Sequence, residues 1–477
     1  MATSSLEDTV AATGYAKVIV ALRNVRADAA APSSLALAAS SQAKGSIENY
    51  FMIPNEAQAT SLAASASHFA SRQFKRKEPV TSRRVRIYPH LGLAIGYVDA
   101  SGLAALEADP QIGKVDKAPE LSLIRPVVVQ SAALGTGPTW GIKRLKADRL
   151  WAAGLKGKGV LVGHLDTGVD ATHPALSGAI GKYAEFDKAG DQVPNAKPSD
   201  SDQHGTHTAG TIVGRSGLKG AFGMAPEAQL ASAMVIEGGQ VIDRILAGMD
   251  WVIGQGVHIL SMSLGLQGFT PAFQTVIDAL RAANVLPVFA VGNEGPSTSR
   301  SPGNYANVLS VGAMDASDDV ADFSSSQQFN RPVNPLCPAL VAPGVEILSC
   351  VPGGKYKVMD GSSMATPHVA GLAALLLQAR PTATADDLER AIVGSCTLPA
   401  GMPQARGNHG VPDAVRAFEL LTGSPLPVAA AAAAVTRGTV AKRGVRGKAP
   451  AGRLAASVAR KGRSKGKKPA TSKRKRN

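Results

Sequence analysis

The sequence contains very little cysteine and few aromatic residues. Its three cysteines, Cys337, Cys350 and Cys396, are spread over 477 residues, and no two of them form a CxxC pair. A sparse and odd number argues against a disulfide framework and is typical of a reducing compartment, where each thiol serves as a small buried side chain. Aromatic residues make up 4% of the chain, but hydrophobic residues make up 44%, which allows a sizeable core in two or three domains.

Two kinds of long hydrophobic segment are also missing. No apolar run reaches the roughly 18 to 20 residues that a membrane-spanning helix needs, so no such helix is expected. The first residues, MATSSLEDTVAATG, have neither the basic start nor the apolar stretch of a secretory leader. We therefore expect a cytoplasmic location, with an extracellular one as the alternative.

Acidic residues are absent from the last part of the chain. Residues 424–477 hold 16 of the 51 Lys and Arg residues and none of the 36 Asp and Glu residues. The preceding residues therefore carry 35 basic and 36 acidic side chains, and the net charge of +15 comes from the tail. This tail starts with an alanine run and has no aromatic residue, so it cannot bury a core and is predicted to be disordered.

The chain before the tail divides into two domains and a joining stretch. Residues 1–120 are interpreted as a small α/β domain, with a strand, an alanine-rich helix, a hairpin, and a further short helix and strand at 15–23, 56–74, 83–99 and 100–119. Residues 121–139 show no clear period and are interpreted as a linker. Residues 140–423 form the largest predicted domain.

Buried strands alternate with helices in this largest domain. Continuous apolar runs, typical of strands covered on both faces, occur at 157–166, 229–236, 256–264, 285–292 and 307–314. Helices are predicted between them, for example at 241–255 and 270–284. Repeated strand–helix–strand units predict an α/β fold with a doubly wound, mainly parallel sheet. Sites in such sheets gather at the carboxyl ends of the strands.

A buried helix is predicted in the stretch DGSSMATPHVAGLAALLLQAR, residues 360–380. Pro367 is tolerated only near a helix start, so the helix begins at about Ser363, and that serine lies at the positive end of the helix dipole. Such a serine can be an N-cap or a nucleophile. It becomes a nucleophile only when a histidine takes its proton and a carboxylate orients that histidine.

Candidates for both partners lie earlier in the same domain. Asp166 closes the first strand in VGHLDTGVD, and His204 starts a small-residue helix in SDQHGTHTAGTIVG. The order Asp, His, Ser is one of three known for such triads. Spacing alone leaves a neighbour of the same type as an alternative for each member of the triad: Asp170, His207 and Ser362.

Three motifs together resemble the subtilisin-like serine proteases, the subtilases. LDTGVD, HGTHTAGT and GSSMATPHVAG occur in the order of that family across most of residues 140–420. The resemblance implies a serine endopeptidase that acts through an acyl-enzyme and is made as a self-processed zymogen. By motif position it assigns the triad to Asp166, His204 and Ser363, and it makes structural neighbours of His207, Ser362, Asp170 and His368.

Two further segments resemble the substrate-binding parts of the family. VFAVGNEGP matches the oxyanion segment, which implies that Asn293 and the backbone N–H of Ser363 bind the forming oxyanion. Taken alone, an Asn in such a stretch is more often a turn residue. SMSLG resembles the strand whose edge pairs with an extended peptide, around Ser263, Leu264 and Gly265, and the alternative is an ordinary buried strand end.

Departures from the family pattern limit what the resemblance implies. Where calcium-binding relatives carry oxygen ligands, this chain has Ala175, Ser216 and Gly217, so the oxygen atoms that calcium prefers are mostly missing. No metal and no other cofactor is therefore predicted. Arg300 lies near the place where the first specificity pocket would be lined, which leaves the preferred substrate residue open.

The resemblance extends to the first domain through its element order and the stretch GLAIGYVDASGLAALEADPQIGKVDKAP. The family has a ferredoxin-like inhibitory propeptide, so residues 1–120 are predicted to be an inhibitor domain and residues 121–139 to contain the processing site. An unrelated small α/β domain is the alternative. The expected partners are polypeptide substrates and the protein's own first domain, and the protein is expected to be a monomer.

Two other functions fit parts of the sequence. The basic tail is typical of segments that bind nucleic acid or another polyanion, and without aromatic residues such binding would have no sequence preference. A solvated extension without a partner is the simpler interpretation of the tail. A catalytically inactive binding scaffold of the same fold is the third hypothesis, and the complete set of motifs argues against it.

Overall fold

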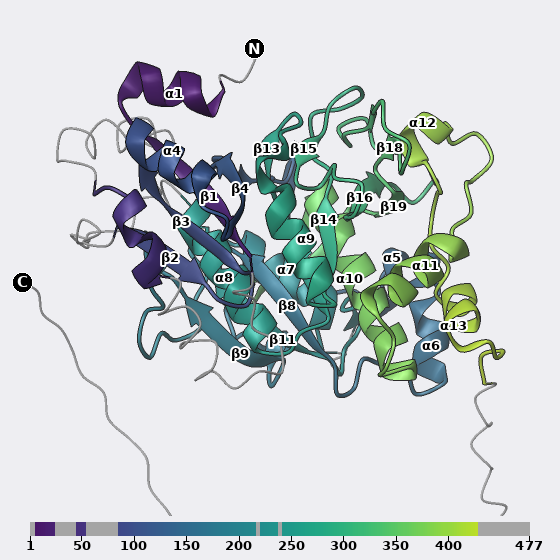
Figure 1. Ribbon diagram of the computed structural model, residues 1–477. Helices are drawn as coiled ribbons and strands as arrows, with labels where there is room; N and C mark the ends of the chain where they lie inside the picture. The colour runs from purple at the N-terminus through teal and green to yellow at the C-terminus, as the bar shows by residue number, and fades with distance from the viewer. Residues whose placement is uncertain (1–4, 24–43, 54–83, 216–219, 237–240, 428–477) are drawn as a thin grey trace, which may run out of the picture. The chain divides into compact units, whose positions relative to one another are not determined.

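The computed structural model describes residues 5–23, 44–53, 84–215, 220–236 and 241–427 (Figure 1). The helix predicted at 56–74 and most of the basic tail lie outside these residues. All three cysteines are free, and Cys337 and Cys350 are buried. Within the described residues, no helix combines the length and the apolar character that crossing a membrane requires.

The N-terminal residues form an antiparallel sheet with the strand order β2-β3-β1-β4. Its strands match the predicted ones, and short helices flank them. In chain order the elements are α1 (Leu6–Thr13), β1 (Ala16–Leu22), η1 (Glu48–Tyr50), β2 (Val85–Tyr88), β3 (Leu93–Val98), α4 (Ala100–Ala108) and β4 (Ile112–Lys117). Successive strand residues point to opposite faces. Val18 and Val20 therefore pack in a small local core, while Ile19 joins a cluster formed mainly by the larger domain.

The larger domain is built on a parallel sheet, as predicted. Within the described residues its seven strands have the order β19-β16-β14-β12-β8-β11-β9. Their bounds are β8 (Leu161–Asp166), β9 (Ile180–Glu185), β11 (Gln229–Met234), β12 (Ile259–Met262), β14 (Leu286–Ala290), β16 (Leu309–Met314) and β19 (Leu340–Pro343). Nearly every residue of the central strands is buried, which explains their continuous apolar runs.

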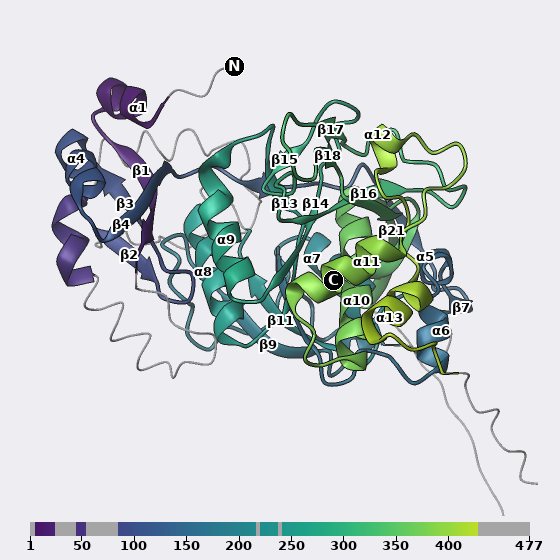
Figure 2. The same ribbon diagram turned by 45° about the vertical axis from the view of Figure 1, so that its right-hand side comes forward.

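Helices cover both faces of this sheet (Figures 1 and 2). On one face lie α7 (His204–Val213) and α10 (Ser362–Ala379), and on the other α8 (Ile242–Gly254) and α9 (Gln274–Ala282). The remaining helices are α5 (Trp140–Arg144), α6 (Ala147–Ala152), η3 (Pro174–Leu176), η4 (Pro271–Phe273), α11 (Ala385–Ser395), α12 (Gln404–Gly407) and α13 (Ala414–Thr422). The doubly wound α/β class predicted from the sequence is confirmed.

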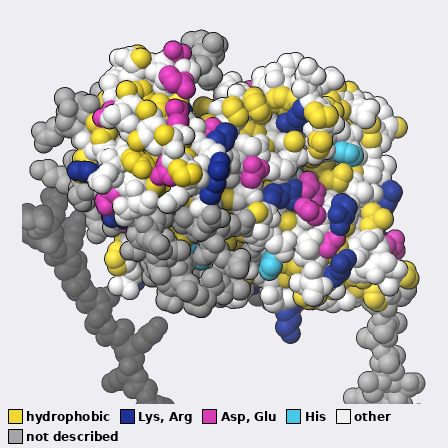
Figure 3. Space-filling view, in the orientation of Figure 1, with side chains coloured by type: hydrophobic (Ala, Val, Ile, Leu, Met, Phe, Trp, Pro, Cys, Tyr) yellow, Lys and Arg dark blue, Asp and Glu magenta, His cyan; other side chains and the backbone are white. Residues whose placement is uncertain are grey.

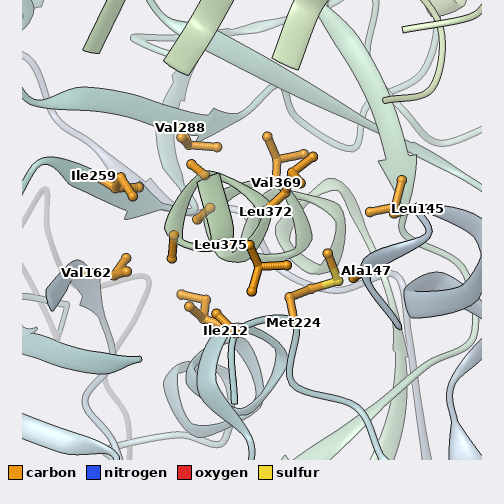
Figure 4. Packing of buried hydrophobic residues seen from close by; sticks show 14 of the residues in the cluster. Leu145, Ala147, Val162, Ile212, Met224, Ile259, Val288, Val369, Leu372 and Leu375 are labelled. Atoms are coloured by element: carbon orange, nitrogen blue, oxygen red, sulfur yellow. The ribbon is translucent and has the colours of Figure 1, made fainter. Parts of the chain in front are cut away.

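The centre of the core is α10, whose first residue is one position from the predicted start. Figure 4 shows Val369, Leu372 and Leu375 of this helix facing side chains from the sheet and from α7. Each of these three side chains is fully buried. Burial of one such side chain contributes roughly 1.5–3 kcal/mol. This packing fixes α10, and therefore the serine at its first turn, against the carboxyl edge of the sheet.

Residues 121–139, predicted to be a linker, have secondary structure of their own. They contain β5 (Ser122–Leu123), β6 (Val128–Ala132) and β7 (Gly137–Pro138), each paired with a strand far away in the sequence. The partners belong to small peripheral sheets that contain β10 (Gly220–Ala221), β13 (Leu264–Gln267), β15 (Arg300–Ser301), β20 (Ile347–Val351) and β21 (Lys355–Asp360), and a further pair joins β17 (Gln327–Gln328) to β18 (Leu336–Cys337). Strands this short show no period that a sequence pattern could reveal.

Candidate active site

Asp166 is the last residue of β8, at the carboxyl edge of the sheet, and only 1% of its surface is exposed. Its Oδ1 atom lies 2.7 Å from Nδ1 of His204 and accepts the backbone N–H of Thr167 at 2.7 Å. Its Oδ2 atom accepts the Thr208 hydroxyl at 3.1 Å. Burial alone would raise the pKa of Asp166, but the charge and hydrogen bond of His204 outweigh it and lower that pKa, so the carboxylate stays ionised.

His204 is the first residue of α7 and is equally buried. A glycine allows this position, because a Cβ on Gly205 would lie 2.0 Å from the carbonyl oxygen of Gly168, in the loop after β8. Burial lowers the pKa of His204, but the carboxylate of Asp166, with smaller contributions from Asp202 and Asp200, raises it above 6.5 overall. Within the described residues, Nε2 of His204 has no hydrogen-bond partner, which leaves it able to accept a proton.

Ser363 is the second residue of α10 and is fully buried. Its hydroxyl donates to the carbonyl oxygen of Ile124 at 2.7 Å. Asp166 and His204 are thus in contact with each other. The hydroxyl of Ser363 instead faces the backbone carbonyl of Ile124, a residue of the same chain.

Asn293 follows β14 and lies beside the start of α10. Its Oδ1 atom accepts both the backbone N–H and the hydroxyl of Ser362, each at 2.9 Å. Its Nδ2 atom then points outward and donates to the carbonyl oxygen of Arg125 at 2.9 Å. A Cβ on Gly361 would lie 3.1 Å from that Nδ2 atom, so a larger residue would crowd the carboxamide. Ser362 thus orients a donor that faces a peptide carbonyl.

The chain passes through this site as an extended segment. Leu123 and Ser122 pair antiparallel with Leu264 and Gly265 of β13, and the N–H of Ile124 donates to the carbonyl oxygen of Ser263 at 3.0 Å. The three residues predicted to bind substrate therefore contact a bound peptide segment, and they do so through their backbone.

Of the alternatives that spacing left, Ser362 lies within this cluster and contacts Asn293, whereas His207 lies apart from it. Nε2 of His207 contacts the carbonyl oxygens of Ile347 and Lys357, and His368 contacts the carbonyl oxygen of Met364 in its own helix. Burial lowers the pKa of His207 to about 3 and that of His368 to about 4, so both are neutral.

Asp170, the alternative carboxylate, is likewise used elsewhere. Its two oxygen atoms accept hydrogen bonds from Thr172 and from the backbone N–H of Gly353. It therefore fixes a loop and, within the described part of the chain, forms no hydrogen bond with His204.

Sequence reasoning missed His164, two residues before Asp166 on the same face of β8. Its Nδ1 atom lies 2.9 Å from the hydroxyl of Ser232, directly beside it on β11, and its Nε2 atom lies 2.9 Å from the hydroxyl of Thr208. Burial lowers the pKa of His164 to about 4, so the ring is neutral. The signal was a histidine inside the otherwise apolar run VLVGHLD.

The direction of the hydrogen bonds around His164 follows from the charge of Asp166. The hydroxyl of Thr208 lies within reach of three acceptors, Oδ2 of Asp166 and the carbonyl oxygens of Gly205 and His204, and its single proton goes to the charged one, Asp166. Thr208 then accepts from Nε2–H of His164, and Nδ1 of His164 accepts from Ser232. The result is a buried chain of hydrogen bonds from Ser232 through His164 and Thr208 that ends on Oδ2 of Asp166.

No group of three His, Cys, Asp or Glu residues in the described part of the chain is placed to hold a metal ion. The polar groups at the end of β8 and at the starts of α7 and α10 instead provide a carboxylate, an imidazole, a hydroxyl and a carboxamide around one peptide segment. A doubly wound sheet with this set at its carboxyl edge is the arrangement of a serine protease.

Comparisons with known proteins agree with this class. Residues 157–416 match the sequence profile described as the subtilase family. The chain is 36% identical over 282 residues to M-protease of Shouchella clausii strain KSM-K16, which covers 58% of this chain and 67% of that protein. It is 33% identical over 321 residues to subtilisin E of Bacillus subtilis strain 168, covering 65% and 77% of the two chains.

A third relative, subtilisin BL of Lederbergia lenta, is 39% identical over 247 residues, covering 51% of this chain and 85% of that protein. The chain belongs to the subtilase family and is a subtilisin-like serine endopeptidase. The resemblance seen in the three motifs is thereby confirmed.

Proposed function

We propose that Ser363 is the nucleophile, His204 its general base and acid, and Asp166 the group that orients His204. The observation that supports this most directly is the bound segment. The hydroxyl of Ser363 touches the carbonyl group of Ile124, so a peptide carbonyl already lies at the nucleophile. The hydrogen bond from Nδ1–H of His204 to Asp166 leaves Nε2 free of a proton, as a general base requires.

The reaction follows from this arrangement of donors and acceptors. The Ser363 oxygen attacks the carbonyl carbon while its proton passes to Nε2 of His204, and the peptide C–N bond then breaks as His204 returns that proton to the leaving nitrogen. Water repeats these steps on the acyl-enzyme. Nδ2 of Asn293 and the backbone N–H of Ser363 hold the negative charge on the carbonyl oxygen during both attacks.

The N-terminal domain is proposed to be the inhibitor of this site. Lys17 of β1 pairs with Asp243 of α8, whose carbonyl oxygen accepts the hydroxyl of Tyr88 at 3.1 Å. Oδ1 of Asp250, also on α8, accepts the backbone N–H groups of His90 and Leu91 at 2.8 and 3.0 Å. These contacts hold the described part of the N-terminal domain against α8, and the segment that follows it pairs with β13 and contacts Ser363.

We further propose that the protein cuts the bond between Ile124 and Arg125. Two successive carbonyl groups compete for the reaction, because Ser363 contacts that of Ile124 while Asn293 contacts that of Arg125. The backbone pairing with Ser263 and the serine contact both favour Ile124. Cleavage after Arg125 would require the ring nitrogen of Pro126 as leaving group, held in a substituted and rigid peptide bond.

A fluorophosphonate probe tests the assignment of the nucleophile. The mature wild-type protein is expected to lose activity in proportion to labelling, with the adduct located on Ser363 by mass spectrometry of the digested protein. Ser395→Ala, which removes another buried serine hydroxyl in α11, should label normally. An adduct on another residue, or activity that survives complete labelling, would contradict the proposed role of Ser363.

A further inference from the structure

A charged side chain contacts both the strand that binds the peptide segment and the segment itself. On one edge β13 pairs with β5, which belongs to that segment, and on the other it pairs with β15, where Arg300 lies opposite Gln267. From there the guanidinium group of Arg300 contacts both Gly265 and the bound segment. Its Nη1 atom donates to the carbonyl oxygen of Gly265 at 3.0 Å and to the hydroxyl oxygen of Ser122 at 3.2 Å.

The opposite side of the guanidinium is fixed by a carboxylate. Nε and Nη2 of Arg300 both donate to Oε1 of Glu294, at 2.8 and 2.5 Å. Oε2 of Glu294 accepts the backbone N–H of Asn293 and the hydroxyl of Ser325, at 3.0 and 3.2 Å. The side chains of Arg300 and Glu294 are only 16% and 22% exposed, so the pair is held in one place beside the residue that donates to the peptide carbonyl.

Two glycines make room for this pair. A Cβ on Gly265 would lie 2.8 Å from Cβ of Arg300. Gly292 has a φ of +121°, and a Cβ there would lie 2.7 Å from Oε2 of Glu294 and 3.2 Å from Cγ of Arg300. The backbone around Gly265 and Gly292 therefore leaves room for a half-buried cation, and the N–H groups of that cation not used by Glu294 donate to Gly265 and Ser122.

We propose that Arg300 is a specificity-determining residue that selects peptides with a hydrogen-bond acceptor at the position of Ser122. This position lies two residues before Ile124, whose carbonyl group belongs to the bond proposed to be cleaved. Aspartate and glutamate are the best substrates at this position, asparagine and serine are intermediate, and leucine and lysine are the poorest. This proposal rests on the proposed function, because it assumes that a substrate binds in the same way as the bound segment.

The order of preference follows from the donors and charges at this position. Nη1 of Arg300 can only donate, so an acceptor side chain satisfies it, whereas leucine excludes water and leaves its N–H group without a partner. A carboxylate forms a charge-assisted hydrogen bond, about twice as strong as a neutral one. Lysine would bring a second cation to the guanidinium. Glu294 cannot offset this repulsion, because its nearer carboxylate oxygen, Oε1, already accepts two hydrogen bonds from Arg300.

The test uses mature enzyme and a set of peptides that differ only at this position, with Asp, Ser, Leu or Lys. For the wild type, kcat/KM is expected to be on the order of tenfold higher for Asp than for Lys, because the site is partly exposed and charge pairs there are weakened by solvent. In Arg300→Gln the ratio of kcat/KM for the Asp peptide to kcat/KM for the Lys peptide should fall to about one. A wild type without preference, or a variant that keeps the full preference, would overturn the proposal.

Self-processing gives a second measurement that needs no Arg300 variant. In the full chain, Ser122→Asp should shorten the time for loss of the N-terminal segment, and Ser122→Lys should lengthen it severalfold. Equal rates for these two variants would count against the role of Arg300. Failure of the proposed function would look different, because hydrolysis would then be absent for every peptide or would persist after Ser363 is labelled.

Discussion

His204, the proposed general base, experiences two opposing effects on its pKa, and their balance sets the pH below which activity is expected to fall. Burial disfavours the charged ring, but Asp166, Asp202 and Asp200 outweigh burial and raise the pKa of His204. Protonated His204 therefore stabilises the fold, a contribution that is present below about pH 6.5 and is lost as pH rises through the higher folded pKa. The proposed mechanism has the opposite requirement, because only a neutral His204 ring can accept the proton of Ser363.

The first prediction follows from the raised pKa of His204. The plot of kcat/KM against pH should rise with a midpoint above 6.5 and stay high on the alkaline side. Hydrolysis of one peptide between pH 4 and 9 measures this midpoint. Maximal activity near pH 4 would indicate a carboxylate mechanism and contradict the assignment of His204.

The hydroxyl of Thr208 gives a second prediction at the residue scale. Thr208→Val removes the donor from Oδ2 of Asp166 at nearly constant volume, so the carboxylate keeps more negative charge for His204. The acid limb should move to higher pH by on the order of half a unit. The variant should also be less stable by about 1–3 kcal/mol, because Nε2–H of His164 loses its acceptor.

Thr211→Val is the matched control for this prediction. Thr211 lies on the same helix, is fully buried, and donates to the carbonyl oxygen of His207 without contact to Asp166. Its loss should lower stability and leave the pH midpoint in place. Equal midpoints for the two variants would show that the chain of donors through His164 has only a structural role.

Sequence patterns could identify the reacting residues only together with the family resemblance. Spacing left Asp166 and Asp170, or His204 and His207, as equal candidates, because both members of each pair lie within one turn or one helix. The chain of Ser232, His164 and Thr208 was out of reach, because it joins three elements whose register appears only in the folded sheet.

At the scale of elements, the helices and strands that carry the core were predictable and the paired short strands were not. Each long element shows its own period or a continuous apolar run, so β8, β12 and α10 could be located from local sequence. The pairing of β5 with β13 depends on backbone hydrogen bonds between segments that lie far apart in the sequence, and no local pattern reveals such a partner. The segment at residues 121–139 was therefore taken for a linker.

The third prediction concerns α10. Leu375 is fully buried at the centre of the cluster in Figure 4, so Leu375→Ala leaves a cavity among side chains from the sheet and α7. Such a truncation should lower the free energy of unfolding by about 2–5 kcal/mol. Leu420→Ala in α13 is the control, because Leu420 is 52% exposed and its loss should cost less than about 1 kcal/mol. Unfolding in urea measures both, and equal losses would contradict the central place of α10.

For the whole molecule, charge separates the domain that performs catalysis from the tail. On the face seen in Figure 3, Lys and Arg side chains are interspersed with Asp and Glu side chains, as the nearly equal numbers before residue 424 would suggest. The excess positive charge lies in residues 424–477, which reach beyond the part that the structure describes. Any polyanion binding should therefore depend on the tail and leave peptide hydrolysis unaffected.

The fourth prediction tests this separation by truncation after Pro427, which keeps the Gly423 cap of α13 and Leu426, which packs on the core. Peptide hydrolysis should stay within about twofold of the wild type. Binding of the full chain to DNA should fall by roughly 10³-fold or more between 50 and 200 mM salt if 6–8 phosphates are neutralised. If the truncated protein binds DNA as tightly as the full chain at low salt, the tail is not the element that binds.

The central claim is that one serine both matures the protein and hydrolyses its substrates. The measurement that tests it most directly is the intact mass and N-terminal sequence of wild type and Ser363→Ala, each purified from a host without other proteases. The wild type should yield a product that begins at Arg125, and Ser363→Ala should remain at full length. A Ser363→Ala protein that acquires the same new N-terminus at the same rate would contradict this account.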